Sequence, residues 1–445
     1  PSVLLAAALL AVLLVDPLAV ISPGFWLSFA AVAVILYAIS GADAKNWKER
    51  LIAWGRLQWA IAAGLLPLLL FLFQQVSLSG PFANLVAIPV VELVVIPATL
   101  LGVAGSFILP DSLAAWPFLL AAKALAILWP MLELLARVEG SQWIQHNPPL
   151  WTLGAALVGV LLLLAPRGVP ARWLGLVWLL PMFLVRPALP APGEARVTLL
   201  DVGQGLAVVV QTAGHTLVYD TGARLSARFD AGRAVVVPFL RHAGLTRVDT
   251  LIVSHGDNDH IGGSASLLAA MPVTRVLSSV PERLANAEAC LSGQQWEWDG
   301  VRFEMLHPDR DSPFTGNNLS CVLRIVSRHG RALLPGDIAA KAERAILLER
   351  KGQLAAEVLV VPHHGSKSSS TETFLDTVRP RVALLPVGYR NRYRHPHPAV
   401  VARYVERGIA LEDSAAAGAI SVRLDAAGLL IDRHRDTQRR YWHGQ

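Results

Sequence analysis

The sequence predicts a polytopic α-helical membrane domain followed by an α/β domain of the αββα sandwich type. Three observations support this fold class: long apolar runs up to about residue 186, a proline-rich stretch at 187–193, and short strand-like runs separated by turns from Arg196 onward. Strands that pack as two sheets leave helices on the outside, which gives the four-layer sandwich. We therefore expect domains at 1–186 and 194–445, joined by an extended linker at 187–193.

The composition agrees with a membrane part attached to a globular part. Of the 445 residues, 53% are hydrophobic and 16% are charged. The mean hydropathy is +0.46, which is too apolar for an ordinary soluble protein. The net charge of +6 is small for this length and does not by itself indicate nucleic acid. The chain starts at Pro1 inside an apolar run, so we expect a fragment that lacks N-terminal sequence.

Several apolar runs follow one another in the first part, more than one soluble core could cover. A membrane-spanning helix needs roughly 20 apolar residues. The third and fourth runs meet this length most comfortably, whereas the last two could be tilted, re-entrant or interfacial. The runs are 3–21, 24–41, 51–73, 84–104, 118–136, 151–165 and 172–185.

The loops between these runs predict an orientation. The loop 42–56 is basic and is expected in the cytoplasm, whereas 74–83 carries no charge and is expected outside. If every later run crosses, the second domain emerges outside the cell membrane, although one miscounted helix would invert this result. The basic residues used are Lys45, Lys48, Arg50, Arg56, Arg167 and Arg172.

Polar and helix-breaking residues interrupt the apolar runs at 16–17, 22–29, 84–89 and 92–97. Irregular backbone and carboxylates at membrane depth are tolerated where they face protein or a water-filled path. They therefore favour a channel or transporter over a simple anchor. Prolines are common in membrane helices, so an ordinary helical bundle remains the alternative.

A loop after the predicted strand 250–253 holds four potential metal ligands, His255, Asp257, Asp259 and His260. Their spacing can aim two pairs of ligands at two neighbouring points, as a two-metal hydrolase requires. The alternative is a polar loop that caps a helix, but capping does not require four ligand-type side chains at this spacing.

Later strand ends supply further candidates. Asp337 follows a glycine turn and could bridge two ions, or could only cap that turn. Of the adjacent His363 and His364, one could bind metal and the other support it or contact phosphate, unless they form a surface pair. Residues before another strand could position water or phosphate, although turn formation explains them nearly as well. These residues are Asn317, Asn318 and Ser320.

The segment 388–398 interleaves arginines with tyrosines and suits a single nucleic-acid strand, with phosphates on guanidinium groups and bases on rings. Its candidates are Tyr389, Arg390, Arg392, Tyr393, Arg394, His395 and His397. The two histidines could reach the metals, but contacts with the metal ligands or with phosphate are expected instead. A solvated basic loop is the alternative. The C-terminal arginines are expected to form a solvated tail; they are Arg433, Arg435, Arg439 and Arg440. Cys290 and Cys321 could pair in an oxidising compartment, which the sequence leaves open.

These motifs together resemble the metallo-β-lactamase superfamily and, more narrowly, the ComEC family of competence DNA-uptake channels. The resemblance covers nearly the whole chain, except that the family's N-terminal OB-like segment and first membrane helices have no counterpart. In the second domain it rests on 201–205, 220–222, 254–263, 335–337 and 362–366, and in the first on 16–29 and 84–89.

The ligand pattern departs from the superfamily, which usually has His-x-His-x-Asp-His. Here Asp257 replaces the middle histidine, and the next metal-site histidine of the superfamily has no counterpart. More oxygen ligands favour harder ions, so Mn²⁺ and Mg²⁺ are candidates beside Zn²⁺ for a divalent two-ion site.

The resemblance implies a metallo-β-lactamase-like second domain that hydrolyses phosphodiesters. One ion would bind Asp259, His260 and one of His363 and His364, the other His255 and Asp257, with Asp337 between them. Asp257, Asp259 and Asp337 are the catalytic candidates, and Asp257 or Asp259 could accept a proton. Further residues expected to border the substrate are Asp201, Gln204 and Ser366.

The resemblance further implies an inner-membrane channel that imports single-stranded DNA, with an extracytoplasmic nuclease domain that degrades the other strand. Expected partners are DNA, membrane lipid, a DNA receptor, and a cytoplasmic ATPase or single-strand-binding proteins, since no Gly-Lys-Ser/Thr nucleotide loop occurs here. The alternatives are a channel whose second domain binds DNA without cutting it, and a membrane-anchored hydrolase of a small phosphoester or lactone.

Overall fold

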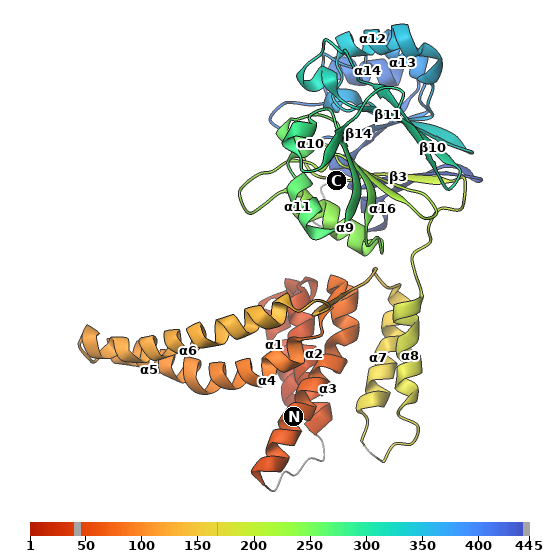
Figure 1. Ribbon diagram of the computed structural model, residues 1–445. Helices are drawn as coiled ribbons and strands as arrows, with labels where there is room; N and C mark the ends of the chain where they lie inside the picture. Colours follow the sequence, from red (N-terminus) through yellow and green to blue (C-terminus); the bar gives the residue numbers. More distant parts are fainter. Residues whose placement is uncertain (40–45, 167, 439–445) are drawn as a thin grey trace. The chain divides into compact units, whose positions relative to one another are not determined.

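The computed structural model describes residues 1–39, 46–166 and 168–438 (Figure 1). It divides the chain into two compact units, Pro1–Pro187 and Ala188–Gln445, which are described separately. Four of the basic residues discussed above lie outside the described residues: Lys45, Arg167, Arg439 and Arg440.

Each predicted apolar run of the first unit contains helix. The helices are α1 Ser2–Val15, α2 Pro23–Ile39, α3 Trp47–Phe73, α4 Gly80–Val90, α5 Ile96–Ser106, α6 Asp111–Arg137, α7 Leu150–Leu164 and α8 Leu174–Leu184. A short 3-10 turn, η1 Pro17–Ile21, follows α1, because the Asp16 carboxylate accepts a hydrogen bond from the Leu18 N–H at 3.0 Å. The loops also contain a small antiparallel pair that the sequence analysis missed, β1 Gln75–Ser77 and β2 Gln142–Ile144.

Within the part of the chain that the structure describes, three stretches are long and apolar enough to cross a membrane: Trp47–Phe73, Gly80–Ser106 and Asp111–Arg137. The second runs through α4, the π-helical turn η2 Val91–Val95, and α5. Pro89 and Pro97 flank this turn, and proline removes a backbone donor, which a π-bulge inside a helix can accommodate. The predicted interruption is therefore a bulge in one continuous helix, and it carries the exposed Glu92.

Small residues allow close helix packing in this unit. The α7 and α8 helices form an antiparallel pair (Figure 1). A Cβ on Gly159 or on Gly175 would collide with the carbonyl oxygen of the other glycine, so the two backbones touch here.

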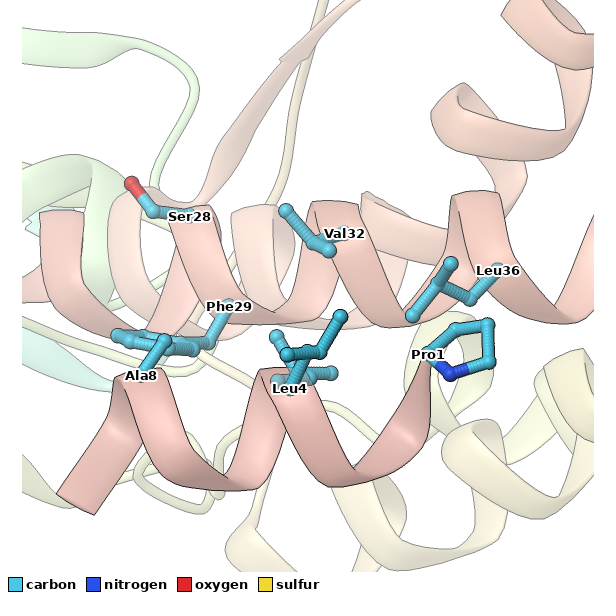
Figure 2. Close-up of a pocket in the computed structure, with 8 residues that line it drawn as sticks. Pro1, Leu4, Ala8, Ser28, Phe29, Val32 and Leu36 are labelled. Carbon is cyan, nitrogen blue, oxygen red and sulfur yellow. The ribbon is translucent and has the colours of Figure 1, made fainter.

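An apolar pocket of about 440 Å³ lies between α1 and α2 (Figure 2). Ser28 is the one polar side chain in a lining made otherwise of Pro1, Leu4, Leu5, Ala8, Phe29, Val32 and Leu36. The space between these helices is therefore a hydrophobic recess rather than a polar passage.

The second unit contains two sheets. The eight-stranded sheet has the order β17-β16-β3-β4-β5-β6-β7-β8, and the seven-stranded sheet the order β15-β14-β13-β12-β11-β10-β9. The first sheet consists of β3 Ala195–Leu199, β4 Val208–Gln211, β5 Thr216–Tyr219, β6 Val248–Val253, β7 Val273–Ser278, β8 Ala287–Ala289, β16 Ile420–Asp425 and β17 Gly428–Arg433. The second consists of β9 Gln295–Trp298, β10 Val301–His307, β11 Val322–Ser327, β12 Gly330–Leu334, β13 Val358–Val360, β14 Val382–Leu385 and β15 Ala410–Asp413.

Three apolar layers hold this unit together. The central layer lies between the sheets and includes Val208, Phe303 and Val358. The two outer layers lie under helices on the far face of each sheet. The main helices are α9 Val237–His242, α10 Asn258–Ile261, α11 Ser264–Ala270, α12 Ala340–Arg350, α13 Glu372–Val378 and α14 Pro398–Glu406, with short α15 Ser414–Ala417 and α16 His434–Thr437. The αββα fold class predicted from the sequence is confirmed.

Two features of this unit go beyond the sequence analysis. Cys290 and Cys321 form a disulfide, and both are buried in the layer between the sheets. The prediction of a solvated C-terminal tail is wrong for two described arginines. The Arg433 guanidinium makes two hydrogen bonds to Glu412, at 2.6 and 2.5 Å, and Arg435 pairs with Asp201 at 2.9 Å.

Candidate metal centre

The candidate ligands come together at one edge of the sandwich, where strands of both sheets end. The loop after β6 carries His255 to His260, the turn after β12 carries Asp337, and the turn after β13 carries His363 and His364. The neighbours β12 and β13 run parallel, so their carboxyl ends lie side by side. Residues far apart in the sequence therefore meet in one cluster.

Four side chains form the most compact part of this cluster. The His364 Nε2 lies 3.3 Å from the Asp259 Oδ2, 3.3 Å from the His260 Nε2 and 3.5 Å from an Asp337 oxygen. The His260 Nε2 lies 3.3 Å from the other Asp337 oxygen. Donor atoms at about 2.1 Å from a tetrahedral ion are about 3.4 Å apart. The spacing thus fits one divalent ion.

A second group lies beside the first. It consists of His255, His260 and Asp337, whose donor atoms lie within 4.8 Å of one another, and the exposed Asp257 approaches the His255 Nε2 at 3.6 Å. The buried His255 Nε2 and Asp337 Oδ1 have no hydrogen-bond partner among the described residues. Unpaired buried polar atoms are costly, so their presence here fits a bound cation.

His260 belongs to both groups but offers one free nitrogen. Its Nδ1 contacts the Asp220 carboxylate at 2.8 Å, which leaves the Nε2 to face the cluster. One nitrogen binds one ion. Asp337 has two carboxylate oxygens and is therefore the residue best able to serve both groups.

Asp220 is a functional candidate that the sequence analysis missed. Its carboxylate is fully buried and also accepts hydrogen bonds from the Ser254 N–H at 2.6 Å and Oγ–H at 2.7 Å. It fixes the orientation of His260, as carboxylates behind metal-binding histidines commonly do. The available signal was its position in the Asp-Thr-Gly turn directly after β5. The Pro386 carbonyl oxygen holds His364 in the same way, 2.8 Å from its Nδ1.

Opposite charges outweigh the effect of burial on the pKa values of His260 and Asp337. Burial alone would lower the pKa of His260, but Asp337 and Asp220 raise it well above its ordinary value. Burial likewise opposes the charge of Asp337, yet His260 and His364 hold its pKa well below the usual range.

The pKa values of the other ligand candidates are shifted in different directions. The pKa of His364 is raised, because Asp337 and Asp259 outweigh its burial, and the pKa of Asp259 is lowered by the neighbouring histidines in spite of burial. The pKa values of His255 and His363 are lowered, mainly by burial. A cation that binds the protonated histidines has to displace their protons.

The structure brings some of the predicted border residues to the centre and not others. The Ser320 Oγ accepts the Asp337 N–H at 3.1 Å, and the Asn317 Nδ2 lies 3.2 Å from the His363 Nε2. Asn318 instead accepts the Ala339 N–H at 2.9 Å and so supports the turn after Asp337. Ser366 donates its N–H to the His363 carbonyl at 2.8 Å and so shapes the His363–His364 turn.

The loop 201–205 lies beside the centre, and its Asp201 carboxylate pairs with Arg435 at 2.9 Å. Gly205 has a φ of +147° and lies against Asp259, where a Cβ would approach the Asp259 carbonyl oxygen to 2.5 Å. The Gln204 Oε1 accepts the Gly388 N–H at 3.3 Å. This loop thus connects Asp259 with the start of the arginine-tyrosine loop, 388–397.

The arginine-tyrosine loop adjoins the centre through His395, whose ring lies 6.2 Å from that of His363. Tyr393 stacks on His395 with a ring separation of 6.0 Å and an interplanar angle of 14°. Arg392 donates to the Tyr393 hydroxyl at 2.7 Å. The His397 Nδ1 accepts the Ala399 N–H at 3.2 Å and so caps α14.

Comparison with known proteins agrees with this geometry. Residues 1–170 match the family "Competence protein", and residues 200–389 match the "Metallo-beta-lactamase superfamily". "Competence protein ComA" of Neisseria gonorrhoeae is 37% identical over 98% of this chain and 60% of its own length. "ComE operon protein 3" of Bacillus subtilis is 29% identical over 87% of this chain and 54% of its own length.

A solved structure of Igni18, a metallo hydrolase from Ignicoccus hospitalis, aligns with 52% of this chain and 99% of its own, with 14% identity and a TM-score of 0.36. This chain spans 60% or less of the length of the two curated relatives named above. The resemblance found in the sequence is confirmed, because residues 1–170 match a competence-protein family and residues 200–389 match the metallo-β-lactamase superfamily.

Proposed function

We propose that this chain is part of a DNA-uptake channel of the bacterial inner membrane, which imports one DNA strand, and that its second unit is a metal-dependent nuclease acting on the other strand. The observation that carries the proposal is the ion-sized cluster of Asp259, His260, Asp337 and His364 beside a loop of arginines and tyrosines. The match of residues 1–170 to the family "Competence protein" and the likeness to "Competence protein ComA" support the uptake part.

The residues of the centre would have three roles, namely to hold one ion, to hold a second ion and to accept a proton. Asp259, His260, His364 and one oxygen of Asp337 would hold one divalent ion, and His255 and Asp257, with the other oxygen of Asp337, the second. When bound, the ions supply an electrophile for the phosphodiester and make hydrolysis accessible near neutral pH. Asp257, whose side chain is 58% exposed beside His255, is placed to accept a proton at its carboxylate from an attacking water.

The arginine-tyrosine loop would bind the nucleic acid. Guanidinium groups bind phosphate oxygens in a bidentate manner, and the exposed rings of Tyr389 and Tyr393 can stack on unpaired bases. Bases in a duplex are already stacked on each other, so this loop favours a single strand. Oxygen ligands in the cluster keep Mn²⁺ and Mg²⁺ as candidates beside Zn²⁺.

An extracytoplasmic position of the second unit is part of the proposal. The predicted loop charges support it, and so does the buried disulfide Cys290–Cys321, since disulfides persist mainly in oxidising compartments. A DNA receptor outside and an ATPase or single-strand-binding protein inside would complete such a pathway.

The test uses the full chain in detergent with labelled single-stranded and duplex DNA, titrated with Mn²⁺, Mg²⁺ and Zn²⁺. We expect metal-dependent cutting that Asp259→Asn abolishes and that the matched exposed control Asp311→Asn preserves. Binding of DNA without cutting under every metal would overturn the nuclease and leave the second candidate, a DNA-guiding domain, which the arginine-tyrosine loop favours. Cutting of a small phosphoester but of neither DNA would support the membrane-anchored hydrolase instead.

A further inference from the structure

The arginine-tyrosine loop has a fixed internal structure centred on Asn391. The Asn391 side chain donates to the carbonyl oxygens of Gly388, at 3.1 Å, and His395, at 2.7 Å. Its Oδ1 accepts the His395 N–H at 3.0 Å. The side-chain amide of Asn391 thus links the start of the loop to its end. The loop therefore has a defined shape before any ligand binds.

A pocket of about 340 Å³ is lined by this loop together with Asp413 and Ala415. Its lining includes Gly388, Arg390, Asn391, Arg394, His395 and Asp413. Small-molecule sites commonly have about 300–1,000 Å³. This volume suits one nucleotide and not a duplex.

The loop arginines fall into two classes. Arg392 does not line the pocket and is engaged with the hydroxyl and ring of Tyr393. Arg390 and Arg394 line the pocket and both have left-handed backbone, with φ of +49° and +56°. Left-handed backbone is uncommon for a residue with a side chain and here it occurs at both pocket arginines.

Neither pocket guanidinium has a carboxylate partner among the residues described by the structure, although Arg390 lies over the Tyr389 ring. Several other arginines of this unit pair with carboxylates, as Arg407 does with Asp376 at 2.7 Å and Arg433 with Glu412. Arg390 and Arg394 are therefore available for an anion. Asp413 is the one carboxylate of the lining, and its oxygen accepts the Ala415 N–H at 2.7 Å.

From these observations we infer that this pocket is a subsite for a single nucleotide, whose phosphate binds Arg390 and Arg394. His395 belongs to the pocket lining and its ring contacts His363, so a nucleotide held here would lie next to a phosphate held at the metal centre. The placement of this subsite beside a scissile phosphate rests on the proposed function. The binding of a nucleotide in the pocket does not rest on it.

The test measures binding of deoxythymidine monophosphate to the full chain in detergent, with a chelator present so that no metal takes part. Thymidine and inorganic phosphate serve as part-ligands. We expect the nucleotide to bind more tightly than either part, and Arg390→Ala or Arg394→Ala to weaken it about ten- to a hundredfold, because each removes hydrogen bonds to a charged group.

The matched control is Arg379→Ala. Arg379 is an exposed arginine with the same left-handed backbone, φ +48°, at the end of α13, outside the pocket. It should leave the affinity unchanged. Equal weakening by Arg379→Ala, or affinity for the nucleotide no greater than that for inorganic phosphate, would overturn the subsite.

The outcome is separable from that of the nuclease test. A chain that binds the nucleotide but cuts no DNA retains the subsite and loses the nuclease. A chain that cuts single-stranded DNA with the same KM before and after Arg390→Ala and Arg394→Ala retains the nuclease and loses the subsite.

Discussion

At the scale of single residues, the centre depends on groups that contact the ligands as much as on the ligands themselves. His260 is fixed by Asp220, His364 by the Pro386 carbonyl, and Asp337 by the Ser320 hydroxyl. The ligand candidates follow from local sequence spacing. Asp220 could not be assigned in the same way, because its role depends on a contact across 40 residues of chain with His260.

Replacing Asp220 tests this supporting role. We expect Asp220→Asn to weaken divalent-metal affinity about ten- to a hundredfold, because a neutral amide no longer fixes and polarises His260. Competition with a metal-sensitive dye measures the affinity. Asp249→Asn is the matched control. Asp249 accepts a hydrogen bond from the Thr216 N–H at 2.8 Å and is not part of the centre. Unchanged affinity in both variants would contradict the role of Asp220.

Metal should also stabilise the protein against unfolding. At a free ion concentration of 100 times the Kd, a ligand that binds the folded state alone adds about 2.7 kcal/mol. We expect Mn²⁺ or Zn²⁺ to raise the Tm of the second unit, and Asp337→Asn to remove most of the rise, because Asp337 contacts both groups. Differential scanning calorimetry checks this, and an equal rise in the variant would argue against Asp337 as a ligand.

At the scale of elements, buried polar contacts and closely packed small residues hold neighbouring helices together. The α12 helix carries the buried Glu343, whose pKa is raised by burial. Its carboxylate accepts the Ser370 N–H at 2.5 Å, the Thr371 N–H at 2.9 Å and the Thr371 hydroxyl at 2.6 Å. These bonds tie α12 to the start of α13, directly after the His363–Ser369 turn.

Removing this carboxylate should therefore loosen the turn that carries His363 and His364. We expect Glu343→Ala to lower the free energy of unfolding by about 1–3 kcal/mol for each donor left buried and unpaired. Denaturant titration measures it. Glu282→Ala, at an exposed position in the turn after β7, is the comparison, and an equal loss there would mean that the Glu343 contacts add nothing.

The helix pair α7 and α8 gives a second test at this scale. We expect Gly159→Leu to destabilise the pair by about 1–3 kcal/mol through overpacking, because its Cβ would strike the Gly175 carbonyl oxygen. Gly154→Leu on the same helix is the matched control, since nothing lies within 4 Å of a Cβ there. Thermal unfolding in detergent should separate the two variants, and similar Tm values would contradict the close contact.

At the scale of the whole molecule, sequence patterns predict the two-part organisation and most strands well, because apolar periodicity and turn residues are local signals. The edge strands β8, β9, β15 and β17 were not predicted, since their pairing partners and not their own composition define them, and the internal strand β7 was missed as well. The C-terminal arginines were misjudged for the same reason. Arg435 pairs with Asp201, which lies 234 positions earlier in the sequence.

The disulfide provides a test at this scale, because it joins two segments of the second unit. It closes a segment with a sequence separation of 31 residues, for which chain entropy predicts a stabilisation of about 3–4 kcal/mol. We expect the double variant Cys290→Ser/Cys321→Ser to unfold at lower denaturant, and thiol labelling of the unreduced, unfolded wild-type chain to find no free cysteine. Full labelling there would contradict the bond and with it the support for an oxidising compartment.

The single free nitrogen of His260 has a consequence for how such a centre fills. Because both donor groups draw on that one lone pair, His260 would hold only one of two ions, and the other would be held by His255 and the remaining carboxylate oxygens. We expect two unequal steps of uptake, one tight and one weak. The activity of the domain would then depend on the concentration of free divalent ion. Molecules with one ion bound would be the main species when that concentration is low.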